Sequence, residues 1–277
     1  METVPIGAAI DSLTIFFVLT TMLSMGLELT LEEIRASLEQ RRLLARALVA
    51  NLVLVPLLAF GLVLAVPMRT EYAIGLVLIA IAPGAPFGPK LAELSRSDIA
   101  FASGLMAVLG IVSVVSIPLS VSVLMPAGVA VDPIAIAELV VVAQLVPLLL
   151  GLGINARSAG LATRLYPPVQ RLSTVSLILL IALLVAVNGE ELLGLVGTGT
   201  LFVSVVVVGS SLLLGYAFGG PARTTREVLA TTTAARNAAI ALLIATASFS
   251  NPSVLTIIVA FSLISLVMSV LLAGEWR

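Results

Sequence analysis

Nine long apolar stretches dominate this sequence and limit the folds that it can adopt. Each is close to the roughly 20 residues that an α-helix needs to cross a hydrocarbon layer about 30 Å thick. The stretches are continuous rather than alternating with polar residues, which favours helices over the strands of a closed barrel. They cover residues 7–27, 43–66, 72–94, 99–125, 134–154, 172–187, 195–218, 228–247 and 254–273.

Charge is scarce in this chain. Charged residues make up only 10% of the 277 residues, and hydrophobic residues make up 60%. A soluble domain has about 25% charged residues, so the lipid bilayer should be the main solvent here. We therefore predict an all-α membrane protein with nine transmembrane helices, folded as a single domain over residues 1–277.

The chain has no cysteine and no histidine. Disulfides, thiolate or imidazole metal sites and cysteine or histidine catalysts are therefore excluded. The Gly-x-Gly-Asp motif of intramembrane aspartyl proteases is absent as well. The net charge of −1 and the dispersed basic residues give no indication of nucleic-acid binding. We predict a protein that is not an enzyme and that needs no cofactor, with sodium as a disfavoured alternative.

The arginine residues predict the orientation in the membrane. With nine crossings and the N-terminus outside, Arg69 alone falls on the outer side, whereas eleven arginines fall on the cytoplasmic side. Cytoplasmic loops carry an excess of basic residues. We predict a multi-pass protein of the cell (inner) membrane with a cytoplasmic C-terminus. The eleven residues are Arg35, Arg41, Arg42, Arg46, Arg96, Arg157, Arg164, Arg171, Arg223, Arg226 and Arg277.

The first cytoplasmic loop has a helical pattern of its own. Thr30 and Glu33 have the spacing of a capping box, in which each side chain accepts a hydrogen bond from the other residue's backbone N–H. Leu31, Ile34 and Leu38 follow at helical spacing on one face. We interpret this segment as a short amphipathic helix at the membrane interface. A solvated connector is the alternative.

Two of the nine stretches are interrupted. Residues 79–90 contain three prolines and two glycines, and a helix cannot continue through such a run because proline lacks the N–H and clashes with the preceding turn. Residues 231–237 place three threonines, an arginine and an asparagine inside an apolar segment. The alternative is that the prolines only kink a packed helix.

The two interrupted stretches occupy matching places in the chain. Each is third in a group of four, residues 7–125 and residues 172–273, and the stretch 134–154 connects the groups. A single intervening crossing turns the second group upside down, which predicts an inverted repeat of 4+1+4 helices. Secondary transporters use this layout, with two broken helices that cross near the midplane and direct half-helix N-termini at anions.

Basic residues lie beside both interruptions. Arg236 falls near the middle of its crossing, where an arginine is costly and indicates a functional site. Its guanidinium can bind a carboxylate through two hydrogen bonds. Lys90 follows the first interruption. The alternatives are a structural pair between Arg236 and Glu138 or another buried acceptor, and a Lys90 side chain that extends to the cytoplasmic interface. Glu138 is the one carboxylate well inside a crossing, which makes it a candidate for proton coupling. The predicted substrate-binding residues are Arg236, Asn237, Thr231, Thr232, Thr233, Gly84, Pro86, Gly88 and Lys90.

Several local motifs resemble those of one transporter family. Residues 25–30 (Met-Gly-Leu-Glu-Leu-Thr), 82–85 (Ala-Pro-Gly-Ala), 91–100 and 236–237 (Arg-Asn) occur in the order and at the spacing of the bile acid:sodium symporter family of ten-helix transporters. The resemblance covers nearly the whole chain, and of the family's ten helices only the first has no counterpart in this sequence. It implies a panel of helices 7–27, 134–154 and 172–187, a core made of the other helices, and cotransport of sodium with organic anions.

The sodium ligands that the resemblance implies are largely replaced. The family's first break ends in Ser-Asn, its second break holds a shared glutamate and a glutamine, and its next helix carries two hydroxyl ligands. The corresponding residues here are Gly88 and Pro89, then Thr232 and Arg236, then Ala102 and Met106. No carboxylate remains at either break, so sodium coupling by the family's route is disfavoured. We expect fixed cations to take the place of the coupling ions.

The predicted function is secondary transport of a small organic anion by alternating access. A sodium-coupled symporter with altered sites and a passive channel are the alternatives. Arsenite exporters with a related architecture use a thiolate, which this chain lacks. The sequence itself specifies no solute, direction of transport or oligomeric state.

Overall fold

Helices form all the regular structure in the residues that the structure describes, 6–126, 128–129, 131–249 and 251–277. This computed structural model confirms the all-α class. The elements are α1 (Ile6–Glu28), α2 (Leu31–Glu39), α3 (Arg41–Val49), η1 (Ala50–Leu54), α4 (Val55–Ala65), α5 (Thr70–Ile81), α6 (Gly88–Leu94), α7 (Ile99–Leu124), α8 (Pro133–Val140), η2 (Val141–Leu145), α9 (Val146–Arg157), α10 (Ala159–Gly194), α11 (Thr200–Phe218), α12 (Arg223–Ala234), α13 (Ala238–Ser248) and α14 (Ser253–Glu275).

Eight helical segments of the described chain are long and apolar enough to cross a membrane. The predicted crossing over residues 72–94 is not one of them, because it is divided into α5, with 12 residues, and α6, with 7. The predicted crossing over residues 228–247 belongs to the segment Arg223–Ser248, which is divided into α12 and α13. Nine crossings therefore stay a prediction that requires α5 and α6 to span the membrane together.

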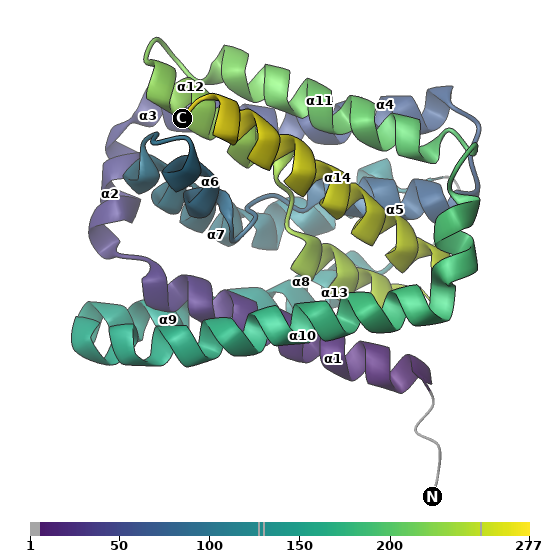
Figure 1. Ribbon diagram of the computed structural model, residues 1–277, viewed down its shortest axis with the longest axis horizontal. Helices are drawn as coiled ribbons and strands as arrows, with labels where there is room; N and C mark the ends of the chain where they lie inside the picture. Colours follow the sequence, from purple (N-terminus) through teal and green to yellow (C-terminus); the bar gives the residue numbers. More distant parts are fainter. Residues whose placement is uncertain (1–5, 127, 130, 250) are drawn as a thin grey trace, which may run out of the picture.

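Three helices run side by side along one edge of the bundle (Figure 1). α1 packs against both α9 and α10, and α9 also contacts α10. The approach of α1 to α9 is close because two glycines face each other. A β-carbon at Gly26 would lie 2.2 Å from the carbonyl oxygen of Leu148, and one at Gly151 would lie 2.5 Å from that of Leu23. Only glycine permits this backbone contact.

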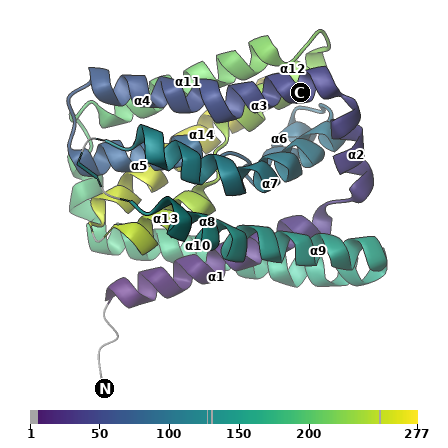
Figure 2. The same ribbon diagram turned by 180° about the vertical axis from the view of Figure 1, so that it is seen from behind.

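The two interrupted helices lie in the interior of the bundle, between α1 and α10 on one side and α4 and α11 on the other (Figure 2). Every residue of α5 from Tyr72 to Ile81 is buried, and 94% of the most apolar window of the Arg223–Ser248 segment is buried, against 28–56% for the other candidate spans. Irregular backbone is tolerated at membrane depth only where protein or an aqueous cavity surrounds it. Their position therefore explains how both helices can be broken.

Two further crossings contain a single π-helical turn. η1 and η2 each end two residues before a proline, Pro56 and Pro147 respectively. Proline has no N–H to donate to the preceding turn, which favours local widening of the helix. Each π-helical turn buries one amide side chain, Asn51 in η1 and Gln144 in η2. The widened turns thus bring polar groups into the bundle.

The region around α10 differs from the prediction. A crossing was predicted over residues 172–187, preceded by a cytoplasmic loop, but helical structure runs from Ala159 to Gly194, with a kink at Asn188, whose backbone angles are not helical. The Ser158 side chain caps its start by accepting a hydrogen bond from the N–H of Leu161. The helix contains the whole predicted crossing and extends it at both ends, and Pro167 and Pro168 are accommodated inside it.

The predicted capping box at residue 30 is confirmed. The Thr30 hydroxyl accepts a hydrogen bond from the N–H of Glu33, and the Glu33 carboxylate accepts one from the N–H of Thr30. Ser37, on the opposite face of α2 from these caps, is buried and donates to the carbonyl oxygen of Phe101 in α7. α2 is therefore held against α7 as a fixed helix rather than a free connector.

Candidate functional site

The two helix interruptions contact each other directly. The N–H of Asn237, in the second interruption, donates to the carbonyl oxygen of Ala82, in the first, over 2.9 Å. Ala85 and Ala235, one from each interruption, are fully buried together with Leu91. The broken ends of α5 and α12 thus satisfy part of each other's backbone hydrogen bonding, as buried backbone requires.

Asn237 also starts the next helix. Its side-chain oxygen accepts a hydrogen bond from the N–H of Ile240 and caps α13. The chain can therefore leave the helix at Ala234 and resume it at Ala238. A capping side chain satisfies one of the N–H groups that a helix start leaves free. The asparagine in the polar patch is accordingly a structural element of the break itself.

Arg236 is buried at this contact, with only 3% of its surface exposed. One of its guanidinium nitrogens, Nη1, donates to the carbonyl oxygen of Asn51 in η1 over 3.0 Å. The other two, Nε and Nη2, have no hydrogen-bond partner among the described residues, and none of the ion pairs found there includes Arg236. Of the predicted alternatives, a pair with Glu138 is not observed, because Glu138 lies exposed on α8, whereas a pair with another buried acceptor is observed in the contact with Asn51. The bundle therefore contains a cation that has no counter-ion in the described part of the chain.

The three threonines before this arginine do not face an open space. All three are fully buried. The hydroxyls of Thr231 and Thr232 donate to carbonyl oxygens one turn earlier in their own helix, including that of Val228. Thr233 Oγ1 accepts a hydrogen bond from Nδ2 of Asn51 over 3.2 Å. The hydroxyl protons of Thr231 and Thr232 are thus directed at their own helix, and Asn51 links both Thr233 and Arg236 to the neighbouring helix.

Apolar atoms fill the space beside the start of α6. A β-carbon at Gly88 would lie 3.0 Å from Cγ and Sδ of Met106 and 3.2 Å from the Cγ2 methyl of Thr232. Met106 and Ala102 are fully buried in α7. Gly84, nearby, adopts a left-handed conformation with φ of 82° that favours glycine. Thioether and methyl groups thus meet where a cation would need several oxygen ligands.

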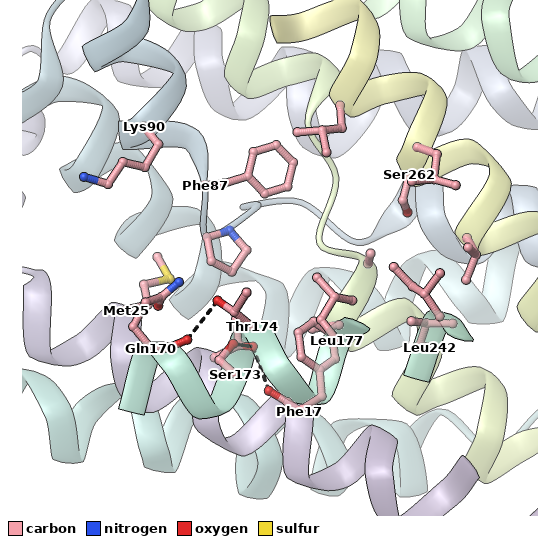
Figure 3. A pocket seen from close by; sticks show the side chains of 18 of the residues that line it. Phe17, Met25, Phe87, Lys90, Gln170, Ser173, Thr174, Leu177, Leu242 and Ser262 are labelled. Atoms are coloured by element: carbon pink, nitrogen blue, oxygen red, sulfur yellow. Dashed lines mark hydrogen bonds between the residues drawn. The ribbon is translucent and has the colours of Figure 1, made fainter. Parts of the chain in front are cut away.

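A cavity of about 330 Å³ lies between the interrupted helices and the three-helix edge of the bundle. Figure 3 shows it bounded by α1 and α10 on one side and by the first interruption, α13 and α14 on the other. Its lining residues are Phe17, Thr21, Met25, Glu28, Pro86, Phe87, Lys90, Tyr166, Gln170, Ser173, Thr174, Leu177, Ile181, Ala238, Ala239, Leu242, Val259, Ser262, Leu263 and Leu266.

The wall formed by α1 and α10 is polar at one end of this cavity. Thr21 and Ser173 share a hydrogen bond of 2.6 Å, and the Ser24 hydroxyl donates to the side-chain oxygen of Gln170. The Tyr166 hydroxyl donates to the Glu28 carboxylate over 3.1 Å. These bonds join α1 to α10 beside the lumen. The cavity therefore combines an apolar body with polar groups at one end, as small-molecule sites do.

The opposite wall provides one cation at the same end. Lys90 Nζ donates to the Glu93 carboxylate over 3.0 Å, and 63% of the Lys90 side chain is exposed. An exposed ion pair of this kind contributes little stability. The ammonium is therefore free to exchange Glu93 for another carboxylate that enters the cavity.

The predicted site residues separate into two groups. Pro86 and Lys90 line the cavity. The others, apart from Glu138, lie behind it, within the buried contact of the interruptions, and do not line it: Gly84, Gly88, Thr231, Thr232, Thr233, Arg236 and Asn237. Glu138 does not line the cavity either.

Sequence reasoning missed the polar wall on α1 and α10. Its residues are Thr21, Ser24, Glu28, Tyr166, Gln170, Ser173 and Thr174. A signal for them exists, because Gln170 and Ser173 are three residues apart, and so are Thr21 and Ser24. Residues at that spacing share a helix face. A polar face on two otherwise apolar helices predicts that the two faces pair or line a cavity.

The sequence is similar to that of a known protein family. A model of the Sodium Bile acid symporter family matches residues 14–195. A probable sodium/metabolite cotransporter of Arabidopsis thaliana, BASS3, is 28% identical over 71% of this chain and 46% of its own length. A second from that plant, BASS1, is 24% identical over 95% of this chain and 66% of its own. An uncharacterized sodium-dependent transporter of Bacillus subtilis, YocS, is 23% identical over 75% of this chain and 64% of its own. The chain thus spans about half to two thirds of the length of these curated relatives.

Proposed function

Because this chain belongs to the sodium bile acid symporter family, we propose that it is a secondary transporter that moves a small organic anion by alternating access without sodium. The observation that carries the proposal is Arg236, a buried guanidinium with two unpartnered nitrogens at the contact between the two broken helices. The family resemblance implies a sodium ligand at this position.

The residues at the family's sodium positions do not suit a sodium ion. A hard cation requires several converging oxygens. Here Met106 and the methyl group of Thr232 pack around Gly88, and Ala102 offers no oxygen. The Thr232 hydroxyl is directed at its own helix. These contacts argue for an apolar packing site where the resemblance implies the first ion.

Arg236 supplies a permanent positive charge where the resemblance implies the second ion. Its contact with the carbonyl oxygen of Asn51 resembles the contact that a bound cation would make with a backbone oxygen. A charge held by the chain does not depend on the sodium gradient. Such a carrier would work as a uniporter, an exchanger or an exporter, and its rate would not respond to sodium.

The cavity is the proposed substrate site. Its volume of about 330 Å³ suits a small organic molecule. We assign the carboxylate of the substrate to Lys90, Gln170 and the hydroxyls of the polar wall, and its apolar body to Phe17 and Leu242. Arg236 and the three threonines do not touch the substrate in this proposal. They hold the two interruptions together, and Arg236 adds positive electrostatic potential to the cavity. Glu138 has no part in this proposal.

Alternating access follows from the proposed division of the bundle. α1, α9 and α10 would form a panel together with α8, and the other helices would form a core with an inverted repeat and nine crossings. The cavity lies where these two units meet. The N-terminus would lie outside. In support, α2, α6 and the start of α12, which are next to most of the arginines, lie at the same end of the bundle as the C-terminus (Figure 1).

Thermal stabilisation of the purified protein tests this proposal. A ligand that binds the folded state raises the melting temperature by mass action. The protein is screened against small organic anions in sodium chloride and in choline chloride. We expect at least one anion to raise the melting temperature equally in both salts. Stabilisation that appears only with sodium would contradict the proposal and favour a sodium-coupled symporter.

Transport of the stabilising anion into proteoliposomes then separates a carrier from a channel. A carrier saturates with substrate and exchanges internal for external anion. A flux that rises linearly with concentration at rates beyond those of carriers would favour the passive channel instead.

A further inference from the structure

A second cavity, of about 340 Å³, lies at the end of the bundle where α3 begins next to the connection between α11 and α12. Figures 1 and 2 both show α3 and α12 close to the C-terminus at this end. The lining consists of one turn of α3 and the loop before α12: Gln40, Arg42, Leu43, Arg46, Gly219, Gly220, Pro221, Ala222 and Thr225. None of these residues belongs to the proposed transport site.

The charge in this cavity is of one sign. Arg42 and Arg46 are four residues apart on α3 and are exposed. Neither has a hydrogen-bond or ion-pair partner among the side-chain contacts of the described residues, whereas Arg35 in the preceding helix is paired with Glu39. No acidic residue is among the described residues that line the cavity. Two guanidinium groups therefore face a hollow with no counter-ion from the chain.

The loop opposite these arginines, residues 219–222, carries only small side chains. Gly220 adopts a left-handed conformation with φ of 80°. Its carbonyl oxygen accepts a hydrogen bond from Arg226, and the Thr225 hydroxyl donates to the carbonyl oxygen of Gly219. These bonds hold the loop in a fixed shape. α12 starts at Arg223 without a side-chain cap, which adds a weak positive potential at the rim.

Aromatic residues place this end of the bundle at the membrane surface. The rings of Tyr216 and Trp276 pack with centroids 5.8 Å apart, and Trp276 is the one tryptophan of the chain. The guanidinium of Arg226 lies 5.7 Å from the centre of the Tyr216 ring. Tryptophan and tyrosine concentrate at the level of the lipid headgroups. A cavity beside these rings would lie at the depth of the lipid phosphates.

We propose that this cavity binds a phosphate group at the membrane surface, carried either by an anionic phospholipid or by a soluble phosphate compound. Arg42 and Arg46 bind the phosphate oxygens, which guanidinium groups do through paired hydrogen bonds. Basic pockets between transmembrane helices recognise anionic headgroups in this way. Leu43 and Pro221 provide an apolar surface for the glycerol region of a lipid. Because the site joins α3 to the α11–α12 loop, its occupant would fasten two parts of the chain that lie far apart in sequence.

The test compares lipids and phosphate on the purified protein in detergent. The probes are dioleoylphosphatidylglycerol, dioleoylphosphatidylcholine and inorganic phosphate, and the readouts are the melting temperature and lipid retention in native mass spectrometry. The variant is Arg42→Gln with Arg46→Gln. The matched control is Arg157→Gln with Arg164→Gln, which removes the same number of cations from the α9–α10 connection.

We expect phosphatidylglycerol to bind with an affinity that falls about 25-fold in the Arg42/Arg46 variant, since each basic residue near the membrane surface contributes about fivefold and the two factors multiply. The control should retain the parental affinity, and phosphatidylcholine should bind weakly to all three proteins. Inorganic phosphate that stabilises the parent and control but not the variant would assign the site to a soluble phosphate. Equal binding of every probe to parent, variant and control would overturn the proposal.

Discussion

Replacing Arg236 with glutamine separates two effects of this residue: the free-energy cost of burying its charge, and its role in transport. The parent buries a cation whose one hydrogen bond, to the Asn51 carbonyl, returns about 1.5–3 kcal/mol. The effective penalty for burying an unpaired ion is several kcal/mol. Glutamine is neutral, and its amide nitrogen lies two bonds short of the Nη1 position, so the substitution removes the buried charge together with the hydrogen bond to Asn51. Arg236→Gln should therefore be more stable than the parent, by about 1–2 kcal/mol.

For a domain of 150–250 residues, each kcal/mol changes the melting temperature by about 2–4 °C. We expect Arg236→Gln to melt a few degrees higher in detergent and to transport at least tenfold more slowly in proteoliposomes. Such opposition between stability and activity marks a residue retained for function. Arg69→Gln is the control, because Arg69 is half exposed and pairs with Glu71, so both measurements should stay near parental values.

Two results would refute this reasoning. Parental transport by Arg236→Gln would show that the fixed charge has no role in the cycle. A melting temperature several degrees below the parent would show that the guanidinium is a net structural contact, and the energetic argument would then be wrong.

Further substitutions test the packing and the cavity. Gly26→Ala should lower the free energy of unfolding by about 1–3 kcal/mol, because the added carbon meets the Leu148 carbonyl oxygen. Gly153→Ala is the control and should not lower it, because Gly153 has open space around it. Equal melting temperatures of the two variants would contradict the close α1–α9 contact. Asn237→Ala removes the cap of α13 and should cost about 1 kcal/mol, measured as faster hydrogen exchange at the start of α13; unchanged exchange would argue against the cap. Gln170→Leu should weaken binding of the stabilising anion about fivefold to tenfold, through loss of one polar contact. Asn155→Leu is the control and should leave the affinity unchanged, because the Asn155 side chain bonds the Leu29 carbonyl outside the cavity. Parental affinity in Gln170→Leu would show that the polar wall is not part of the binding site.

Local chemistry made much of the fold predictable. The proline run before Gly88 cannot form a helix, and the chain breaks there as predicted. The capping box at Thr30 and Glu33 forms as its spacing requires. The early start of α10 was not predicted. Pro167 and Pro168 lie inside the helix, and no sequence signal distinguishes that outcome from a loop.

The candidate site was less predictable because it depends on contacts between distant segments. The sequence indicated that Arg236 lies inside the membrane, but its one partner, the carbonyl oxygen of Asn51, is a backbone group 185 residues away. The polar patch at Thr231 to Thr233 suggested a lined cavity, yet these hydroxyls bond to their own helix or to Asn51. The cavity instead uses Gln170 and Ser173, whose role follows only from how α1 packs on α10.

Direct binding of radioactive sodium to the purified protein tests the central claim most directly. With Arg236 and Met106 at the positions where the family resemblance places ion ligands, we predict no saturable sodium binding at physiological concentrations, with or without the stabilising anion. Saturable binding of one or two sodium ions per chain that increases when the anion is added would contradict the account.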